Sequence, residues 1–171
     1  VDVEQIFVDA AATLGPRVRW IVDPIDGTAN FAAGLTYFGT SVGVELDGEI
    51  VAGAISVPFN YEVFVADSDR AWHVDERTGD TEPLRSAGPR KESEALLASY
   101  YPSVYALRSN KQKALERERA LFTEFSAVRR PGAGAVDLAM VAAGWIGVAM
   151  GVAFKPWDVA AGIHLVEMAG G

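Results

Sequence analysis

The sequence predicts an α+β domain built as a layered sandwich. Two observations lead to this prediction: short apolar strands joined by tight turns fill the middle of the chain, and helical patterns flank them on both sides. The chain has 171 residues, of which 50% are hydrophobic, so it is long enough to bury one core. We assign residues 1–171 to a single domain, because no linker, repeat or low-complexity tract divides them.

The first part of the chain predicts a helix, a strand and then an antiparallel meander. Apolar residues at four-residue spacing indicate a helix over residues 1–14, which a Gly-Pro pair ends, and residues 18–22 form an apolar strand. Asp47 and Gly48 give the turn signal of a hairpin, and such short turns require antiparallel neighbours. The meander strands are expected at residues 38–46, 50–57, 62–66, 71–74 and 82–84.

The second part predicts helices that alternate with short strands. The clearest helix is amphipathic, with Leu115 and Phe122 on its apolar face. The last helix takes Asp158 as its N-cap, and Trp145 is expected in the core. The expected strands are residues 93–101, 128–130 and 145–150, and the expected helices are residues 111–125, 135–143 and 159–169.

Composition excludes several functional classes. A net charge of −8 argues against a nucleic-acid partner, which needs an excess of Lys and Arg. The absence of cysteine excludes disulfides and thiolate chemistry and fits a cytoplasmic protein, and residues 1–14 show no leader pattern. Residues 138–154 carry no charge, but this run is shorter than the ~20 residues of a membrane span and is broken by glycines. We therefore interpret it as a buried helix and strand.

Chemistry is concentrated where the strand over residues 18–22 ends. Asp23 and Asp26 follow buried apolar residues, where charge is costly without a partner. A hard divalent cation is the expected partner, because it takes oxygen ligands from carboxylates and from a carbonyl such as that of Ile25. Backbone N–H groups of Gly27 and Thr28 would then bind an anion beside the metal. The alternative is a plain turn at this point, with Thr28 as a helix cap.

A second group of candidates lies far along the chain. Asp158 alone fits an N-cap, although a carboxylate has a second oxygen for metal. Asp137 fits a cap or a structural acid, and His73 and His164 fit surface or polar-core positions. Small residues at Gly132, Ala133 and Gly134 would let a sugar or polyol approach the backbone, and tight helix packing explains them equally well.

Two long motifs together resemble the inositol monophosphatase family of magnesium-dependent, lithium-sensitive phosphatases. They are the Asp-Pro-Ile-Asp-Gly-Thr element over residues 23–28 and the Trp-Asp element that starts at Trp157 and ends in Ala-Gly-Gly at residue 171. Residues 130–138 also resemble the glycine- and alanine-rich substrate segment of the family. Both motifs occur in the family's order and separation, which is a specific signal.

The resemblance implies an αβαβα sandwich of the inositol monophosphatase and fructose-1,6-bisphosphatase type. It implies hydrolysis of a small phosphate monoester by metal-activated water, in a homodimer, with about two or three Mg²⁺ ions that Mn²⁺ can replace. The implied metal ligands are Asp23, Ile25, Asp26 and Asp158. The implied phosphate ligands are Gly27 and Thr28, the implied catalytic residues are Asp23, Asp26 and Thr28, and the implied substrate-binding residues are Gly132, Ala133, Gly134 and Asp158.

The sequence departs from the family pattern in two places. The family has a catalytic Glu in a Gly-Glu-Glu-like turn upstream of Asp23; Glu4 lies at a suitable distance but lacks that context, so we expect that a segment is absent near residue 15. The family also continues past the equivalent of Gly171. An acid before Trp157 is missing, which leaves inositol phosphate, histidinol phosphate, a sugar bisphosphate and a phosphonucleotide open as substrates. The alternative function is a catalytically impaired, regulatory protein that binds phosphate or metal.

Overall fold

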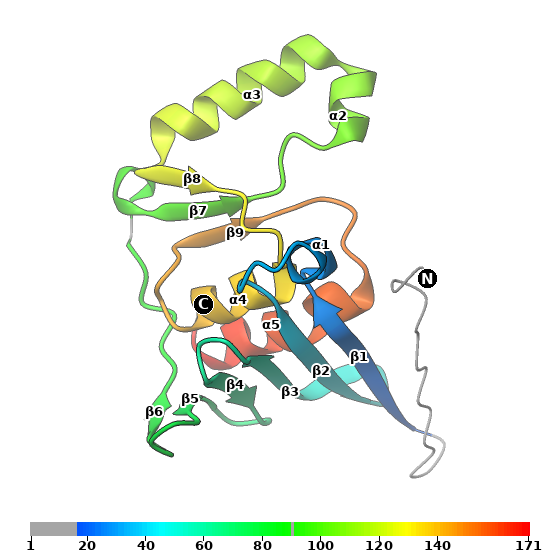
Figure 1. The fold of residues 1–171 in the computed structure, drawn as a ribbon, viewed down its shortest axis with the longest axis vertical. Helices are drawn as coiled ribbons and strands as arrows, with labels where there is room; N and C mark the ends of the chain where they lie inside the picture. The colour runs from blue at the N-terminus through cyan, green and yellow to red at the C-terminus, as the bar shows by residue number, and fades with distance from the viewer. Residues whose placement is uncertain (1–16, 90) are drawn as a thin grey trace.

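The computed structural model describes residues 17–89 and 91–171, and these residues form stacked layers of sheet and helix. In Figure 1, a helix pair (α4 and α5) lies between a large sheet below and a small sheet above, and a further helix (α3) covers the small sheet. This arrangement confirms the predicted α+β sandwich. The predicted helix over residues 1–14, and Glu4 within it, lie outside the described residues.

The large sheet is the predicted meander. Its six strands pair antiparallel with their chain neighbours, in the order β1-β2-β3-β4-β5-β6. The strand β1 runs to Asp26, four residues past the predicted end, with a register shift between Asp23 and Asp26 where it pairs with β2. The six strands are β1 (Val18–Asp26), β2 (Gly39–Leu46), β3 (Glu49–Val57), β4 (Glu62–Ala66), β5 (Ala71–Asp75) and β6 (Thr81–Pro83).

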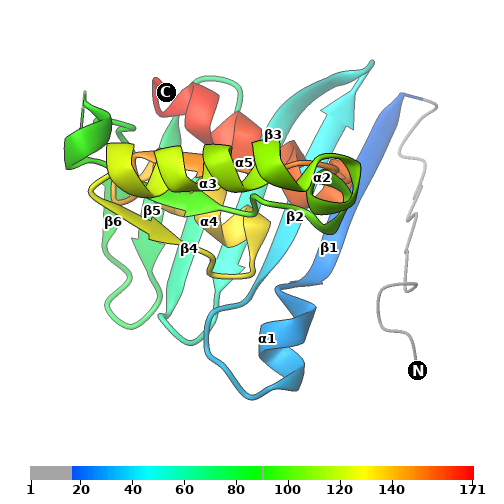
Figure 2. The ribbon, with the colours of Figure 1, turned by 90° about the horizontal axis from the view of Figure 1, so that it is seen from above.

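Two helices pack closely on the inner face of this sheet because small residues line the contact. They are α4 (Gly134–Ala142) and α5 (Pro156–Met168). A Cβ added at Gly53 of β3 would lie 3.0 Å from the Cα of Ala161 in α5, so the helix rests almost on the strand backbone. The buried core continues through Ile55, Phe64 and Leu165, which are fully buried. These contacts place the first turns of α4 and α5 near the end of β1 (Figures 1 and 2).

The contact between α4 and α5 is so close that we expect one added methyl group to lower the stability of the fold. A Cβ at Gly162 would lie 2.6 Å from Cβ and 2.7 Å from Cδ1 of Leu138. We expect Gly162→Ala to lower the free energy of unfolding by about 1–3 kcal/mol through overpacking. Urea unfolding measures this, and the double variant Gly162→Ala/Leu138→Ala is the control. If the two substitutions prove additive, with no relief of the clash in the double variant, steric overlap is not the cause.

The small sheet differs from the meander because its strands are parallel. Its order is β8-β7-β9, from the strands β7 (Leu96–Ser99), β8 (Ala127–Arg129) and β9 (Val148–Met150). Parallel neighbours need a helical crossover, which α2 (Val104–Ser109) and α3 (Lys111–Glu124) supply between β7 and β8. A one-turn 3₁₀ helix (Glu92–Glu94) precedes β7, and α1 (Thr28–Ala32) follows β1.

Three sequence predictions are corrected here. The short helix α2 was not predicted; it begins at the N-cap Ser103, whose hydroxyl accepts the N–H of Ala106. Trp145 is not in the core, because it follows the end of α4 before β9 starts and is 50% exposed. On α3, Leu115 and Phe122 remain 42% and 61% exposed. The apolar face of that helix is therefore only partly covered by the described residues.

The uncharged run over residues 138–154 is divided between two elements. It begins inside α4 and ends after β9, as the sequence predicted. None of the helices in residues 17–89 and 91–171 has the length and apolar character needed to cross a bilayer.

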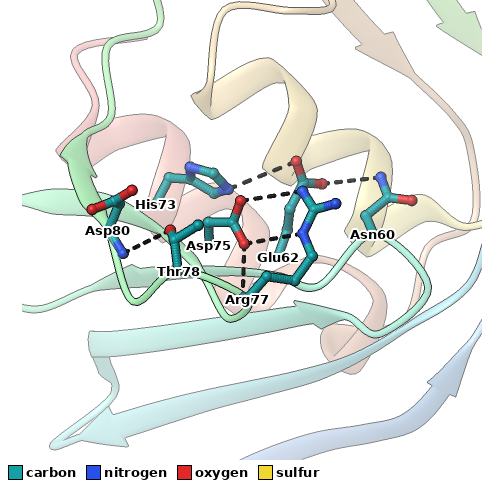
Figure 3. Close-up of polar contacts among 7 residues, drawn as sticks. All are labelled: Asn60, Glu62, His73, Asp75, Arg77, Thr78 and Asp80. Atoms are coloured by element: carbon teal, nitrogen blue, oxygen red, sulfur yellow. Dashed lines mark hydrogen bonds and ion pairs between the residues drawn. The ribbon is translucent and has the colours of Figure 1, made fainter.

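A polar network fixes the turns at one end of β4 and β5 (Figure 3). Asp75 accepts bonds from the Arg77 guanidinium, at 3.1 and 3.3 Å, and from the Arg77 backbone N–H. Glu62 accepts a bond from Asn60 and lies 3.7 Å from His73, whose ring also stacks near Phe64. His164 is buried and its Nε2 lies 2.9 Å from the carbonyl of Asp67. His164 therefore occupies a polar-core position as predicted, whereas the His73 ring packs against Phe64 and Trp145 and its buried Nε2 has no hydrogen-bond partner among the described residues.

Candidate active site

The most constrained acid of the first motif is Asp26. It ends β1 and is only 6% exposed. Its Oδ2 accepts the backbone N–H groups of Ala135 at 2.8 Å and Val136 at 3.1 Å, in the first turn of α4. A helix N-terminus leaves such N–H groups without helical partners, so a carboxylate fits there. Ala135 and Val136 follow Asp26 by 109 and 110 positions in the chain, so this contact brings the first motif to the glycine-rich segment.

Burial gives Asp26 an unusual ionisation. Burial, together with the charges of Asp23 and Asp137, raises the pKa of this carboxyl to about 7, although the N–H groups of Val136 and Ala135 act to lower it. A carboxylate held here at neutral pH therefore gains from a nearby cation. The donor set of hard carboxylate and carbonyl oxygens fits a divalent ion such as Mg²⁺.

The residues around Asp26 form one hydrogen-bonded unit. Asp23 Oδ1 accepts the N–H of Ile25 at 3.1 Å, and the Thr28 hydroxyl donates to the Ile25 carbonyl at 2.9 Å. Gly27 holds a left-handed conformation, with φ 83°, that favours glycine. A Cβ there would lie 2.9 Å from Cβ of Ala133, so the turn and the glycine-rich segment are in direct contact.

Asn30 ties that segment to the first motif. Its Nδ2 donates to the carbonyl of Tyr37 at 2.7 Å and to the carbonyl of Pro131 at 2.8 Å. Gly132, with φ 95°, passes so close that a Cβ would lie 3.1 Å from the Asn30 amide. The predicted substrate residues, Gly132 to Gly134, are therefore held against the Asp23–Thr28 turn. The sequence reasoning missed Asn30, although an amide side chain two residues after the motif threonine was the available signal.

The prediction that Asp158 is the N-cap of α5 is wrong. The N-cap of α5 is Lys155, and Pro156 takes the first helical position, where its missing N–H costs nothing. Asp158 stands in the first turn instead, and its Oδ2 accepts the Lys155 N–H at 2.7 Å. In the described part of the chain, no three acidic or histidine side chains gather at metal-ligand spacing. The membership of Asp158 in a metal site with Asp23 and Asp26 stays a prediction.

Asp137 is a structural acid rather than a cap, because Ala133 is the N-cap of α4. It is fully buried and accepts the hydroxyls of Tyr37 at 2.6 Å and Tyr100 at 2.7 Å. Burial raises the pKa of Asp137 to about 6, and the two tyrosine bonds hold it from rising further. Burial and the Asp137 charge in turn raise the pKa of both tyrosines above its usual value.

Comparison with known proteins agrees with this geometry. The sequence profile described as "Inositol monophosphatase family" matches residues 3–171. The chain belongs to the inositol monophosphatase family. Among its relatives, the inositol-1-monophosphatase of Mesorhizobium japonicum is 37% identical over 90% of this chain and 55% of its own. The fructose-1,6-bisphosphatase/inositol-1-monophosphatase of Aquifex aeolicus is 33% identical over 92% of this chain and 57% of its own.

The family's solved structures share this fold. The crystal structure of the extragenic suppressor protein suhB from Bartonella henselae superposes with a TM-score of 0.77 at 35% identity, over 90% of this chain and 56% of that one. The layered sandwich expected from the resemblance is thereby confirmed. The chain spans a little over half the length of the curated family members it matches, so their activity is carried to it only as a proposal.

Proposed function

We propose that this inositol monophosphatase family protein hydrolyses a small phosphate monoester with the help of bound Mg²⁺. The observation that supports this most is Asp26, a buried carboxylate beside Asp23 that the first turn of α4 holds against the glycine-rich segment. Such a site joins acids suited to a metal with backbone suited to a polyol. Buried acids that are placed in this way are typical of functional sites.

The proposed ligands of about two or three Mg²⁺ ions are the carboxylates of Asp23, Asp26 and Asp158 and the carbonyl of Ile25. Mn²⁺ is the proposed substitute. When bound, Mg²⁺ would lower the pKa of a coordinated water and would stabilise negative charge on the phosphoryl and leaving oxygens. The hydrogen bond from the Ile25 N–H to Asp23 Oδ1 supports this ligand set, because it ties the Asp23 carboxylate to the residue whose carbonyl is the other proposed ligand.

The other residues of the turn are proposed to bind the phosphate group and to orient the attacking water. Backbone N–H groups of Gly27 and Thr28 are the proposed phosphate contacts, because they stand at the start of α1, where N–H groups have no helical partner. The Thr28 hydroxyl, which donates to the Ile25 carbonyl, is the proposed group that orients the attacking water. Gly132, Ala133 and Gly134 are the proposed contacts of the alcohol part of the substrate, and Asp158 is the proposed acceptor of one of its hydroxyls. Ala133 is buried, so its proposed contact is through the backbone.

We propose inositol monophosphate or a related phosphorylated polyol or sugar as the substrate. Lys155 supports a substrate with a second anionic group, because it stands exposed before α5 where the family's acid is missing. The Aquifex relative, whose name includes fructose-1,6-bisphosphatase, supports the same extension. A cytoplasmic homodimer is part of the proposal.

Phosphate release from a substrate panel tests the proposal. The panel contains inositol monophosphate, fructose 1,6-bisphosphate, histidinol phosphate and a 3′-phosphonucleotide, each with Mg²⁺ and with EDTA. We expect release from at least one of them only with Mg²⁺, and inhibition by Li⁺. Absence of release from every substrate, by protein that binds Mn²⁺ and phosphate, would instead establish the second candidate function, a regulatory protein. That candidate is favoured by one observation, a relative named for another role: the Nus factor SuhB of Pseudomonas aeruginosa is 33% identical over 92% of this chain and 56% of its own.

A further inference from the structure

Asp137 has more hydrogen-bond partners than a cap would need. Both of its oxygens are occupied, by Tyr37 at 2.6 Å and by Tyr100 at 2.7 Å, and its side chain is fully buried. Burying a charged group is costly unless it is bonded, so the two hydroxyls are required once the acid is present. These tyrosines come from segments 100 and 37 residues away, which suggests that the acid holds those segments.

The tyrosine on one side connects Asp137 to the first motif. Tyr37 lies in the connection between α1 and β2, and its carbonyl accepts the Asn30 amide at 2.7 Å. Asn30 also donates to Pro131 at 2.8 Å, just before the glycine-rich segment. Through Tyr37, Asp137 therefore fixes both the turn after Asp26 and the segment proposed to contact substrate.

The tyrosine on the other side connects Asp137 to the loop before α5. Tyr100 follows β7, and its N–H donates to the Met150 carbonyl at 2.9 Å. Its ring meets the Phe154 ring edge-on, with centroids 5.8 Å apart. Phe154 lies four residues before Asp158, in the loop that leads into α5. The segments that carry the proposed ligands and substrate contacts are thus linked to one buried carboxylate, the first motif through Tyr37 and the loop before α5 through Tyr100.

We propose that Asp137, with Tyr37 and Tyr100, is a positioning residue that aligns the metal-binding carboxylates by fixing the first turn of α4 and the two loops beside it. The inference rests on the proposed function for the identity of the metal site. The link is short, because Asp137 follows directly after Ala135 and Val136, the residues whose N–H groups hold Asp26. A shift of this helical turn therefore moves Asp26.

The test compares variants that remove one hydroxyl and keep the ring. In the protein as encoded, we expect Tyr37→Phe and Tyr100→Phe each to raise the Kd for Mn²⁺, measured by calorimetry, about 3–10-fold. The double variant is expected to exceed either single variant, and kcat for phosphate release is expected to fall about tenfold in each. Tyr105→Phe is the matched control, since Tyr105 is 80% exposed, and it is expected to change neither quantity.

A purely structural role gives a different pattern. If the Phe variants lose thermal stability but keep the wild-type Mn²⁺ Kd and kcat in their folded form, the inference is overturned. Asp137→Asn is a further variant with a larger expected effect, and the tyrosine variants decide the question even where it fails to fold. Wild-type protein that binds Mn²⁺ but releases no phosphate contradicts the proposed catalysis alone. Wild-type protein that binds no Mn²⁺ contradicts both proposals.

Discussion

Asp23→Asn is expected to lower kcat for phosphate release by on the order of 10²–10³-fold or more. The amide keeps an oxygen that can accept the Ile25 N–H, so the turn is expected to stay folded. It removes the negative charge that Asp23, as a proposed ligand, would supply to bound Mg²⁺. The measurement is phosphate release at saturating Mg²⁺ on the best substrate of the panel.

The control for this prediction is Asp69→Asn, which neutralises an exposed acid in the connection between β4 and β5. It removes the same charge from the protein and is expected to leave kcat unchanged. Near-UV circular dichroism shows whether both variants keep the native packing. An Asp23→Asn protein with full activity removes Asp23 from the proposed machinery.

Asp26→Asn is expected to change activity and stability in opposite directions. It should lower phosphate release as strongly as Asp23→Asn, because a proposed ligand is lost. In EDTA at pH 8 it should raise the free energy of unfolding, because it removes a charge that is costly to bury while its oxygen still accepts the N–H groups of Ala135 and Val136. We expect the free energy of unfolding to rise by about 2–4 kcal/mol, because each unit by which the pKa of Asp26 is raised corresponds to about 1.4 kcal/mol.

Proton linkage gives the direction in which the stability of the fold changes with pH. The pKa of Asp26 rises from 3.8 to about 7 on folding, so between these values the folded protein binds more protons than the unfolded chain. Stability without metal therefore falls as pH rises from about 4 to about 7 and then levels off. The pKa of Asp137, raised to about 6, adds a fall in the same direction.

Urea unfolding in EDTA at several pH values between 4 and 8 measures this. The wild type is expected to lose stability over that range, and Asp26→Asn is expected to lose less of it. Saturating Mg²⁺ should restore the free energy of unfolding that the wild type loses by pH 8, and it should leave the free energy of unfolding of Asp26→Asn unchanged. Equal pH dependence in the two proteins contradicts the assignment of the buried charge to Asp26.

The meander was predictable because its signals are local. Turn residues such as Asp47 and Gly48 lie between strands that pair with their immediate neighbours, so pattern and position agree. The parallel sheet has no such signal, since β7 pairs with β8 about thirty residues further on and with β9 about fifty residues on. The six-residue helix α2 is also too short for a hydrophobic period to show.

The turn that carries the proposed site follows from local sequence signals, but the contacts that support this turn do not. Asp23, Asp26 and Thr28 lie within six residues of one another, and the hydrogen bonds that Asp23 and Thr28 make with Ile25 stay within the turn. The contact of Asp26 with α4 spans 109 residues, and the Tyr37–Asp137 bond spans 100, so only the tertiary fold shows them. The N-cap of α5 was placed three residues too late because Pro156, which favours the first helical position, was not used.

The most direct test of the proposed site is anomalous diffraction from crystals of the encoded protein grown with Mn²⁺ and phosphate. The proposal predicts Mn²⁺ bound by Asp23, Asp26 and Asp158 together, with phosphate at the N–H groups of Gly27 and Thr28. Mn²⁺ bound elsewhere, or an Asp158 that keeps only its bond to Lys155 while Mn²⁺ saturates the crystal, would contradict it.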